Sequence, residues 1–174
     1  AAGTRPGSFQ GLVDNISVTK SAVQPPVIGE FQNGSFETGD LTGWTAQDSM
    51  AIAGSVIGWE IDGSYVALLG MTKNGNSVSG SISQEFTVTP GKVYDIGATY
   101  RQNNGNQNGV TANYTLTVTG GGSTLFTDSK SVARSNGNVV AEGTFNAGTN
   151  TTVTVTIACT ATATATPGSF QNVV

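Results

Sequence analysis

The sequence predicts an all-β fold, a jelly-roll-like antiparallel β-sandwich, and three observations support this. Apolar and polar residues alternate with period two along most of the chain, and no segment has a convincing helical period. Turn signals such as Pro90-Gly91 and Asn136-Gly137 separate short segments at near-even spacing. The 174 residues are enough for one domain with a sizeable core. Many short, evenly spaced strands are typical of a sandwich or jelly roll.

The alternation defines the individual strands. The clearest one is Thr151–Thr160, in which Val153, Val155 and Ile157 share one face, and Val110–Thr119 has the same pattern. The other predicted strands are Phe9–Thr19, Glu30–Glu37, Ser49–Ile57, Ser64–Leu69, Gly80–Val88, Lys92–Tyr100, Ser123–Ser131 and Asn138–Phe145.

A repeated block suggests how the chain is organised. TRPGSFQGLV at residues 4–13 returns as TPGSFQNVV at residues 166–174, but only the first copy continues into DNISVTK. This pattern predicts a repeat unit cut inside a strand. We therefore expect an N-terminal strand (residues 1–20), an extended linker with Pro25-Pro26 (residues 21–29) and a sandwich domain (residues 30–174).

The N-terminal strand is apolar enough to be buried in a sheet, and an unpaired strand of this kind would promote aggregation. It either completes the sheet of its own chain or enters the sheet of a second copy of the chain. The second option is strand addition, which joins copies head to tail and can produce a filament. The chain is alternatively an excerpt of a covalent tandem array. The residues expected to carry the assembly contacts are Phe9, Leu12, Val13, Ile16 and Val18, with either Leu12 or Val13 facing the core.

Composition argues against several classes of partner. Charged residues are 10% of the chain, the net charge is −4 and the Lys and Arg residues are scattered, so we expect no nucleic-acid partner. No apolar run is long enough for a membrane span. The abundance of Gly, Thr, Ser and Asn is typical of secreted proteins, and we expect an extracellular or cell-surface location, with a virion surface as a variant of it.

The sequence also argues against an enzyme. It has no His, which excludes a Ser-His-Asp site and a His-ligated zinc. Its eleven acidic residues show no recognisable pair of glycosidase type. The single Cys159 lies in an alternating run and is expected to be a buried apolar filler.

Several blocks resemble known families. NGSFETGDLTGW at residues 33–44 resembles the opening of bacterial carbohydrate-binding-module-like jelly rolls. IDGSYVALLG at 61–70 and GSISQEFTVTPGKVYDI at 80–96 resemble the next blocks of the DUF642 and choice-of-anchor C families, whose closing block resembles TPGSFxxxxDNISVT. The resemblance implies a galactose-binding-like β-sandwich, an extracellular setting, tandem repetition and glycan binding.

The same resemblance implies a structural calcium ion. In related jelly rolls the ion is held by the Glu of an NGSFE-like block and the Asp of a VDN-like block, which are Glu37 and Asp14 in this sequence. Ca²⁺ prefers such hard oxygen ligands, and Asn33 offers an amide oxygen. The alternative is that Glu37 and Asp14 only cap turns.

Two regions are candidates for contact with a glycan. Trp59 has Glu60 and Asp62 beside it, and these acids can accept hydrogen bonds from sugar hydroxyls. Arg101 and Asn103 begin an amide-rich loop. Core packing of Trp59 and a solvated loop are the alternatives, and Trp44 is expected to be a core residue under a turn. We therefore expect a non-catalytic fibre subunit joined through its terminal strand or, alternatively, a carbohydrate-binding module for polysaccharide.

Overall fold

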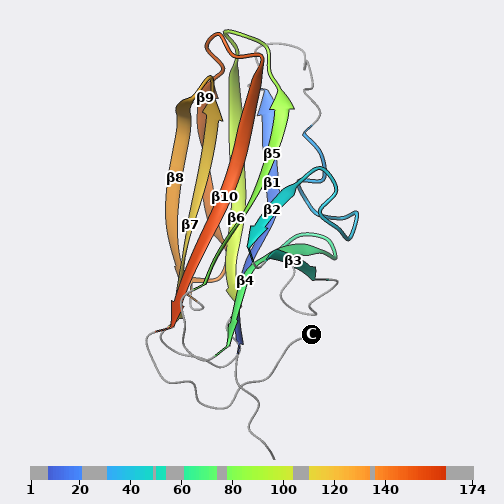
Figure 1. Ribbon diagram of the computed structural model, residues 1–174, viewed down its shortest axis with the longest axis vertical. Helices are drawn as coiled ribbons and strands as arrows, with labels where there is room; N and C mark the ends of the chain where they lie inside the picture. The colour runs from blue at the N-terminus through green and yellow to red at the C-terminus, as the bar shows by residue number, and fades with distance from the viewer. Residues whose placement is uncertain are drawn as a thin grey trace, which may run out of the picture.

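The computed structural model describes residues 8–20, 31–48, 50–53, 61–73, 78–103, 110–133 and 136–163. These residues form two five-stranded antiparallel sheets and contain no α-helix (Figure 1). The predicted all-β, jelly-roll-like sandwich is confirmed. Within the described ranges, no helix of the length and apolarity needed to cross a membrane is present.

The two sheets pack face to face and are here called sheet A and sheet B. Sheet A has the order β3 (Met50–Ala53), β4 (Val66–Lys73), β1 (Ser8–Lys20), β6 (Val93–Asn103) and β9 (Val139–Asn146). Sheet B has the order β2 (Thr45–Asp48), β5 (Val78–Thr87), β10 (Thr152–Ala163), β7 (Val110–Gly120) and β8 (Ser123–Ala133).

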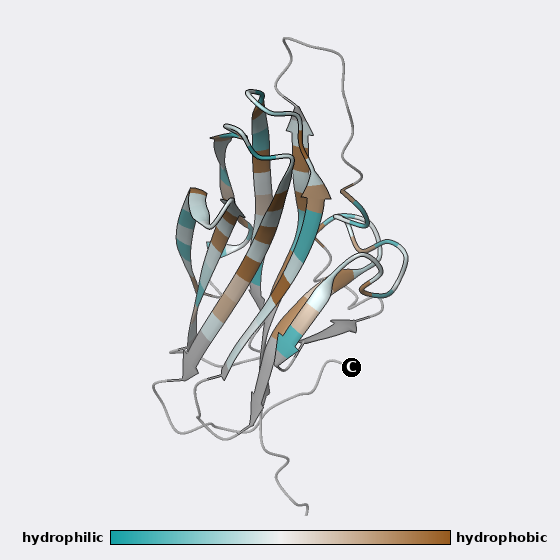
Figure 2. Cartoon of the chain, turned by 45° about the horizontal axis from the view of Figure 1, so that its top comes forward, coloured by the Kyte–Doolittle hydropathy of each residue, from teal (hydrophilic) through white to brown (hydrophobic). Residues whose placement is uncertain are grey.

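The core lies between the sheets and is built from the inward half of each alternating pattern. Hydrophobic and hydrophilic bands alternate along the strands in Figure 2. Tyr100 of sheet A stacks on Tyr114 of sheet B with ring centroids 4.4 Å apart. Cys159 is 2% exposed, which confirms it as a buried filler. Trp44 is buried as predicted, and its indole Nε1 donates to the carbonyl oxygen of Asn33 over 3.1 Å.

Strand β1 is a central strand of sheet A, although it comes first in the sequence. It pairs with β4 on one side and with β6 on the other. Leu12 and Val13 are both fully buried, where alternation predicts only one of them inside. Val13 and Ile16 belong to the main core, whereas Leu12 packs with Val66 and Leu68 in a separate small cluster. Val13 is therefore the one of the pair that faces the core between the sheets, whereas Leu12 is buried on the other face of sheet A.

A bulge interrupts β1 between Asp14 and Ser17. The register with β6 shifts there, and Asn15 has a φ of 51°. Asn tolerates this left-handed conformation better than most residues do. The extra residue changes the inward spacing from two to three, so that Val13 and Ile16 both face the core.

The predicted strand Glu30–Glu37 is wrong over its described part. Residues 31–44 form turns and coil, and Asn33 and Phe36 have φ values of 50° and 58°, which lie outside the range of a regular strand. The next strand, β2, was missed because its sequence TAQD has no apolar period. Residues 21–29 and the second copy of the repeat at 166–174 lie outside the described residues.

Candidate functional site

The outer face of sheet B carries a regular array of hydroxyl groups. Apart from Gln84 and Gly80 of β5, the inward residues of its three central strands are apolar, and the residues between them point outward and are almost all Ser or Thr. We call this array the hydroxyl face, and it comprises Ser79, Ser81 and Ser83 of β5, Thr154, Thr156 and Thr160 of β10, Thr115, Thr117 and Thr119 of β7, and Thr127 and Ser129 of β8.

The strand register aligns these side chains in rows. Thr156 pairs with Ser83 on one side and with Thr117 on the other, and the row continues to Thr45 of β2 and Thr127 of β8. Neighbouring strands lie about 4.8 Å apart, so this row spans roughly 19 Å.

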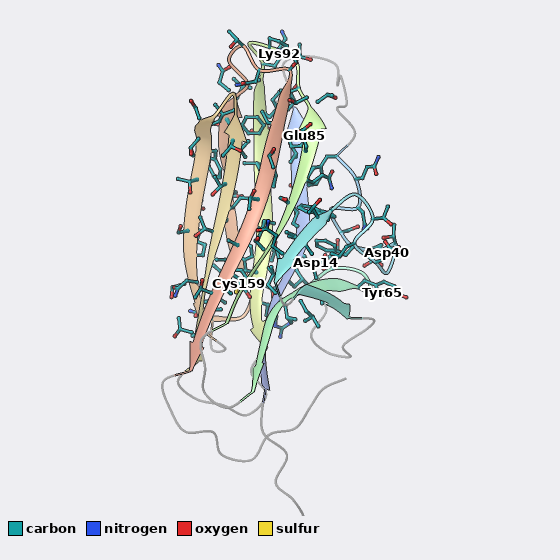
Figure 3. All side chains as sticks on the ribbon, in the orientation of Figure 1. Asp14, Asp40, Tyr65, Glu85, Lys92 and Cys159 are labelled. Atoms are coloured by element: carbon teal, nitrogen blue, oxygen red, sulfur yellow. The ribbon has the colours of Figure 1, made fainter. Side chains whose placement is uncertain are left out.

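The hydroxyl face is almost uncharged. Among the described outward residues of β5, β10 and β7, Glu85 is the single charged side chain, and none is aromatic. Figure 3 shows Glu85 on this side of the sandwich. Each hydroxyl supplies one donor and two acceptor positions, so the face is suited to a neutral partner that is itself rich in hydroxyls. Thr115 and Ser129 bond each other across β7 and β8 over 3.1 Å.

A second polar group lies where β1 meets the loop before β4. Both oxygens of Asp14 accept backbone hydrogen bonds, Oδ1 from Asn15 N over 2.6 Å and Oδ2 from Asp62 N over 3.1 Å. The Glu37 carboxylate accepts from Ser64 N over 2.9 Å and from Tyr65 N over 3.0 Å. Asp14 and Glu37 thus hold the same loop through its amide groups.

The environment of Asp14 disfavours its charge. The side chain is fully buried, and this desolvation raises its pKa from 3.8 to about 7. The two amide donors oppose the rise, whereas the nearby charges of Asp62 and Glu37 add to it. A bound cation would reverse this balance, because it would favour the ionised carboxylate.

The proposed calcium ligands are only partly brought together. Asp14 and Glu37 meet at the 61–65 loop, and their oxygens have the hard donor chemistry that Ca²⁺ prefers. Asn33 instead bonds within its own turn, with Nδ2 donating to Asp40 O over 2.9 Å. Among the described residues, no group of three or more His, Cys, Asp or Glu side chains could share an ion. The calcium site stays a prediction.

The glycan-contact residues predicted from sequence do not form one site within the described chain. Trp59 and Glu60 lie outside the described residues. Asp62 is exposed in the loop beside Asp14. Arg101 lies on β6 in sheet A, where its carbonyl oxygen accepts a hydrogen bond from the Tyr114 hydroxyl over 3.2 Å. Asn103 ends β6, and its side chain is not described.

The sequence reasoning missed the hydroxyl face, although the signal was present. In TTVTVTI the apolar residues predict the inward face of the strand. The Thr residues between them form the outward face, for which no role was predicted. The registers of β5, β7 and β10 then place the Thr and Ser residues in rows, which one strand alone cannot reveal.

Comparison with known protein families identifies the family to which the chain belongs. A family described as Carbohydrate binding domain (CBM_4_9) matches residues 30–166, which is most of the chain. The chain belongs to this family of carbohydrate-binding domains. A search of curated proteins gives no match. Strand β1 lies before the matched region, yet it occupies the centre of sheet A.

Proposed function

We propose that this protein is a non-catalytic, extracellular module that binds a neutral polysaccharide through the hydroxyl face of sheet B. The family match over residues 30–166 is the observation that carries the proposal. The rows of Ser and Thr supply donors and acceptors that match glycan hydroxyls in kind. Because the described face has no aromatic residue to stack on sugar rings, we expect weak binding at a single face and a preference for long polymers.

Paired Thr→Val substitutions test this surface. Val matches the shape of Thr and suits a strand, so Thr117→Val with Thr156→Val removes two hydroxyls from one row without a cavity. We expect binding to weaken by about tenfold, since each lost hydrogen bond contributes roughly 0.5–1.5 kcal/mol. The measurement is affinity electrophoresis in soluble xylan, glucomannan and mixed-linkage glucan.

The matched control is Thr99→Val, which makes the same change on the outer face of sheet A. Equal binding by the parent and the double variant would exclude the hydroxyl face. Absence of binding by the parent to all polymers would count against the function itself.

A second function is favoured by the position of β1. We propose that the slot between β4 and β6 also accepts this strand from a second copy of the chain, which would join copies head to tail. The strand lies outside the family match and is connected to it in the sequence through residues 21–29. Leu12, Val13 and Ile16 are at most 3% exposed, and burial of each such side chain contributes roughly 1.5–3 kcal/mol. Their sum is comparable to the stability of a whole domain.

Peptide complementation tests this strand. A chain that starts at residue 21 is refolded with a synthetic peptide of residues 6–20, and we expect folding only when the peptide is present. The control peptide carries Val13→Asp, which places a charge in the core. In parallel, the full chain is incubated with fluorescent peptide, and exchange is followed by size-exclusion chromatography. A truncated chain that folds unaided, or a full chain that never exchanges, would contradict strand donation.

A further inference from the structure

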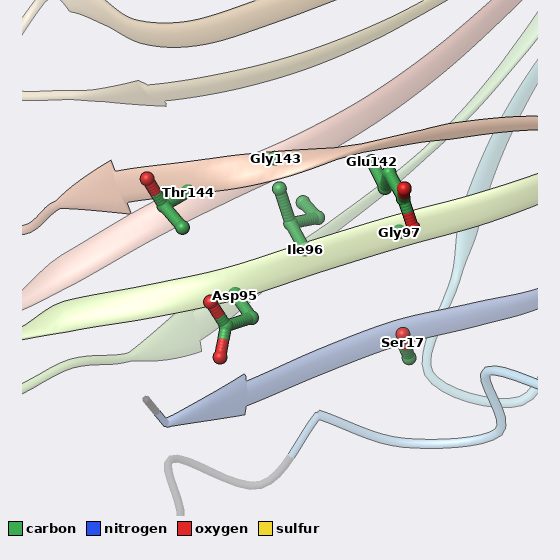
Figure 4. A pocket seen from close by; sticks show the side chains of 7 residues that line it. All are labelled: Ser17, Asp95, Ile96, Gly97, Glu142, Gly143 and Thr144. Atoms are coloured by element: carbon green, nitrogen blue, oxygen red, sulfur yellow. The ribbon is translucent and has the colours of Figure 1, made fainter. Parts of the chain in front are cut away.

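A cleft of about 500 Å³ lies on the outer face of sheet A, on the opposite side of the molecule from the hydroxyl face. Three neighbouring strands form it, with Ser17 on β1, Asp95 and Gly97 on β6, and Glu142 and Thr144 on β9 (Figure 4). Its volume falls in the range of roughly 300–1,000 Å³ that is usual for ligand sites.

The strand register places polar side chains around Gly97. This glycine pairs with Ser17 on one side and with Glu142 on the other. Asp95 pairs with Thr144 one row away. Two carboxylates and two hydroxyls therefore surround the backbone of Gly97, which forms the base of the cleft.

Nothing in the packing requires glycine at position 97. A Cβ there would meet Ser17 Oγ at 3.5 Å and Ala141 O at 3.6 Å, which are ordinary contacts. The neighbouring Gly143 differs, because a Cβ at that position would overlap the ring of Phe126 in the core. Glycine weakens a central strand, and in strand interiors it often marks a place where a ligand approaches closely. The cleft is open because residue 97 has no side chain.

The lining chemistry selects the class of ligand. The described residues that line the cleft include no Lys or Arg, so anionic ligands are disfavoured. The ion pair found among the described residues, Lys130 with Asp128, lies on β8 of the other sheet. Carboxylates and hydroxyls at strand spacing can accept and donate to the adjacent hydroxyls of a sugar ring, and hydrogen bonds to charged acceptors are the stronger ones.

We propose that this cleft is a second sugar-binding site, which takes a residue of a neutral glycan independently of the hydroxyl face. The choice of a sugar as ligand rests on the proposed function, whereas the cleft itself is defined by its geometry. With one contact surface on each sheet, a single domain would cross-link two polysaccharide chains.

The test is an amide-resolved NMR titration with cellohexaose, xylohexaose and mannohexaose. Two sets of shifted amides are expected with one of these probes, one at Gly97, Glu142 and Gly143 and one on β7 and β10. Gly97→Thr fills the cleft with a residue that suits a strand. We expect this variant to keep the parent melting temperature or exceed it, and to lose only the first set of shifts.

Glu142→Gln keeps the shape of the side chain and removes its charge. We expect affinity at the cleft to fall by at least about tenfold. Glu85→Gln, the same change on the other sheet, should leave the cleft shifts unaltered and serves as the matched control.

The outcomes separate the two proposals. Shifts confined to the hydroxyl face would overturn the second site and leave the proposed function intact. Shifts confined to the cleft would support the second site and overturn the hydroxyl face as the binding surface. Cleft shifts that persist in Gly97→Thr, or that appear with CaCl₂ in place of sugar and vanish with EDTA, would overturn the sugar site. If no probe shifts any amide, both proposals fail.

Discussion

Asp14 shows how a single carboxyl group can link the stability of this domain to pH. Desolvation raises its pKa to about 7, so the folded chain holds this proton more tightly than the unfolded chain, where the value is near 3.8. The resulting stabilisation is complete below about pH 4 and is lost as the pH rises through 7. In EDTA we therefore expect the free energy of unfolding to fall between pH 5 and pH 8, by at most about 1.4 kcal/mol per pH unit.

Urea unfolding at several pH values checks this expectation, and Asp14→Asn should flatten the profile. Asp40→Asn is the control. Hydrogen bonds from Thr42 and Thr38 lower the pKa of the exposed Asp40 carboxyl, so its ionisation changes the free energy of unfolding only at acid pH. Calcium bound at Asp14 and Glu37 would raise the stability at pH 8 in the parent and not in Asp14→Asn. A parent profile that is flat without cations would contradict the desolvation of Asp14.

At the scale of elements, the junction between β1 and the first turn holds the central strand in place. Ile16 N donates to Gly34 O over 2.9 Å, and a Cβ at Gly34 would overlap the Ile16 carbonyl oxygen. We expect Gly34→Ala to lower the free energy of unfolding by roughly 2 kcal/mol or more, since backbone cannot move aside as a flexible side chain can. Hydrogen exchange should then show faster opening of β1 than of β10.

Gly97→Ala is the matched control, because its Cβ meets only ordinary contacts. Equal stabilities of the two variants would show that β1 does not depend on this junction. If Gly34→Ala made the amides of β1 and β10 exchange faster to the same extent, the junction would stabilise the whole sandwich rather than β1 alone.

The strands could be predicted from sequence wherever one face is apolar and the other polar, as in β5, β7 and β10. Such alternation is a local property of the chain. The turn region 31–44 was not predicted, because Asn33 and Phe36 take left-handed conformations that follow from contacts within the fold. The location of β1 between β4 and β6 also escaped prediction. Strand order depends on contacts distant in sequence, and the bulge at Asn15 hides the period of β1.

The candidate sites also depend on contacts between residues that are distant in the sequence, which local patterns do not reveal. The pairing of Asp14 with the turn that contains Glu37 followed from a family resemblance, and the structure brings both to the 61–65 loop. The hydroxyl face and the cleft at Gly97 arise from register between strands, so no single segment encodes them. Trp59 and Glu60 remain predictions, since they lie outside the described residues.

At the scale of the whole molecule, the central strand of each sheet pairs on both sides with strands that are distant in the sequence. In sheet A this strand is β1, which enters from outside the matched family region, and in sheet B it is β10. Cys159 lies on β10 and is flanked by complete ladders to β5 and β7. Its thiol therefore reports on the opening of the sandwich itself.

We expect Cys159 to react with a disulfide reagent only when the domain unfolds globally. The residue is 2% exposed, and burial raises the pKa of its thiol to about 12, so the reactive thiolate is scarce in the folded state. The chain has no other cysteine, so the signal has one source. The logarithm of the labelling rate at pH 8 should rise with urea at the slope of equilibrium unfolding. Fast labelling that does not depend on urea would show that β10 opens locally, and the sandwich would then have its weak point in sheet B rather than at β1.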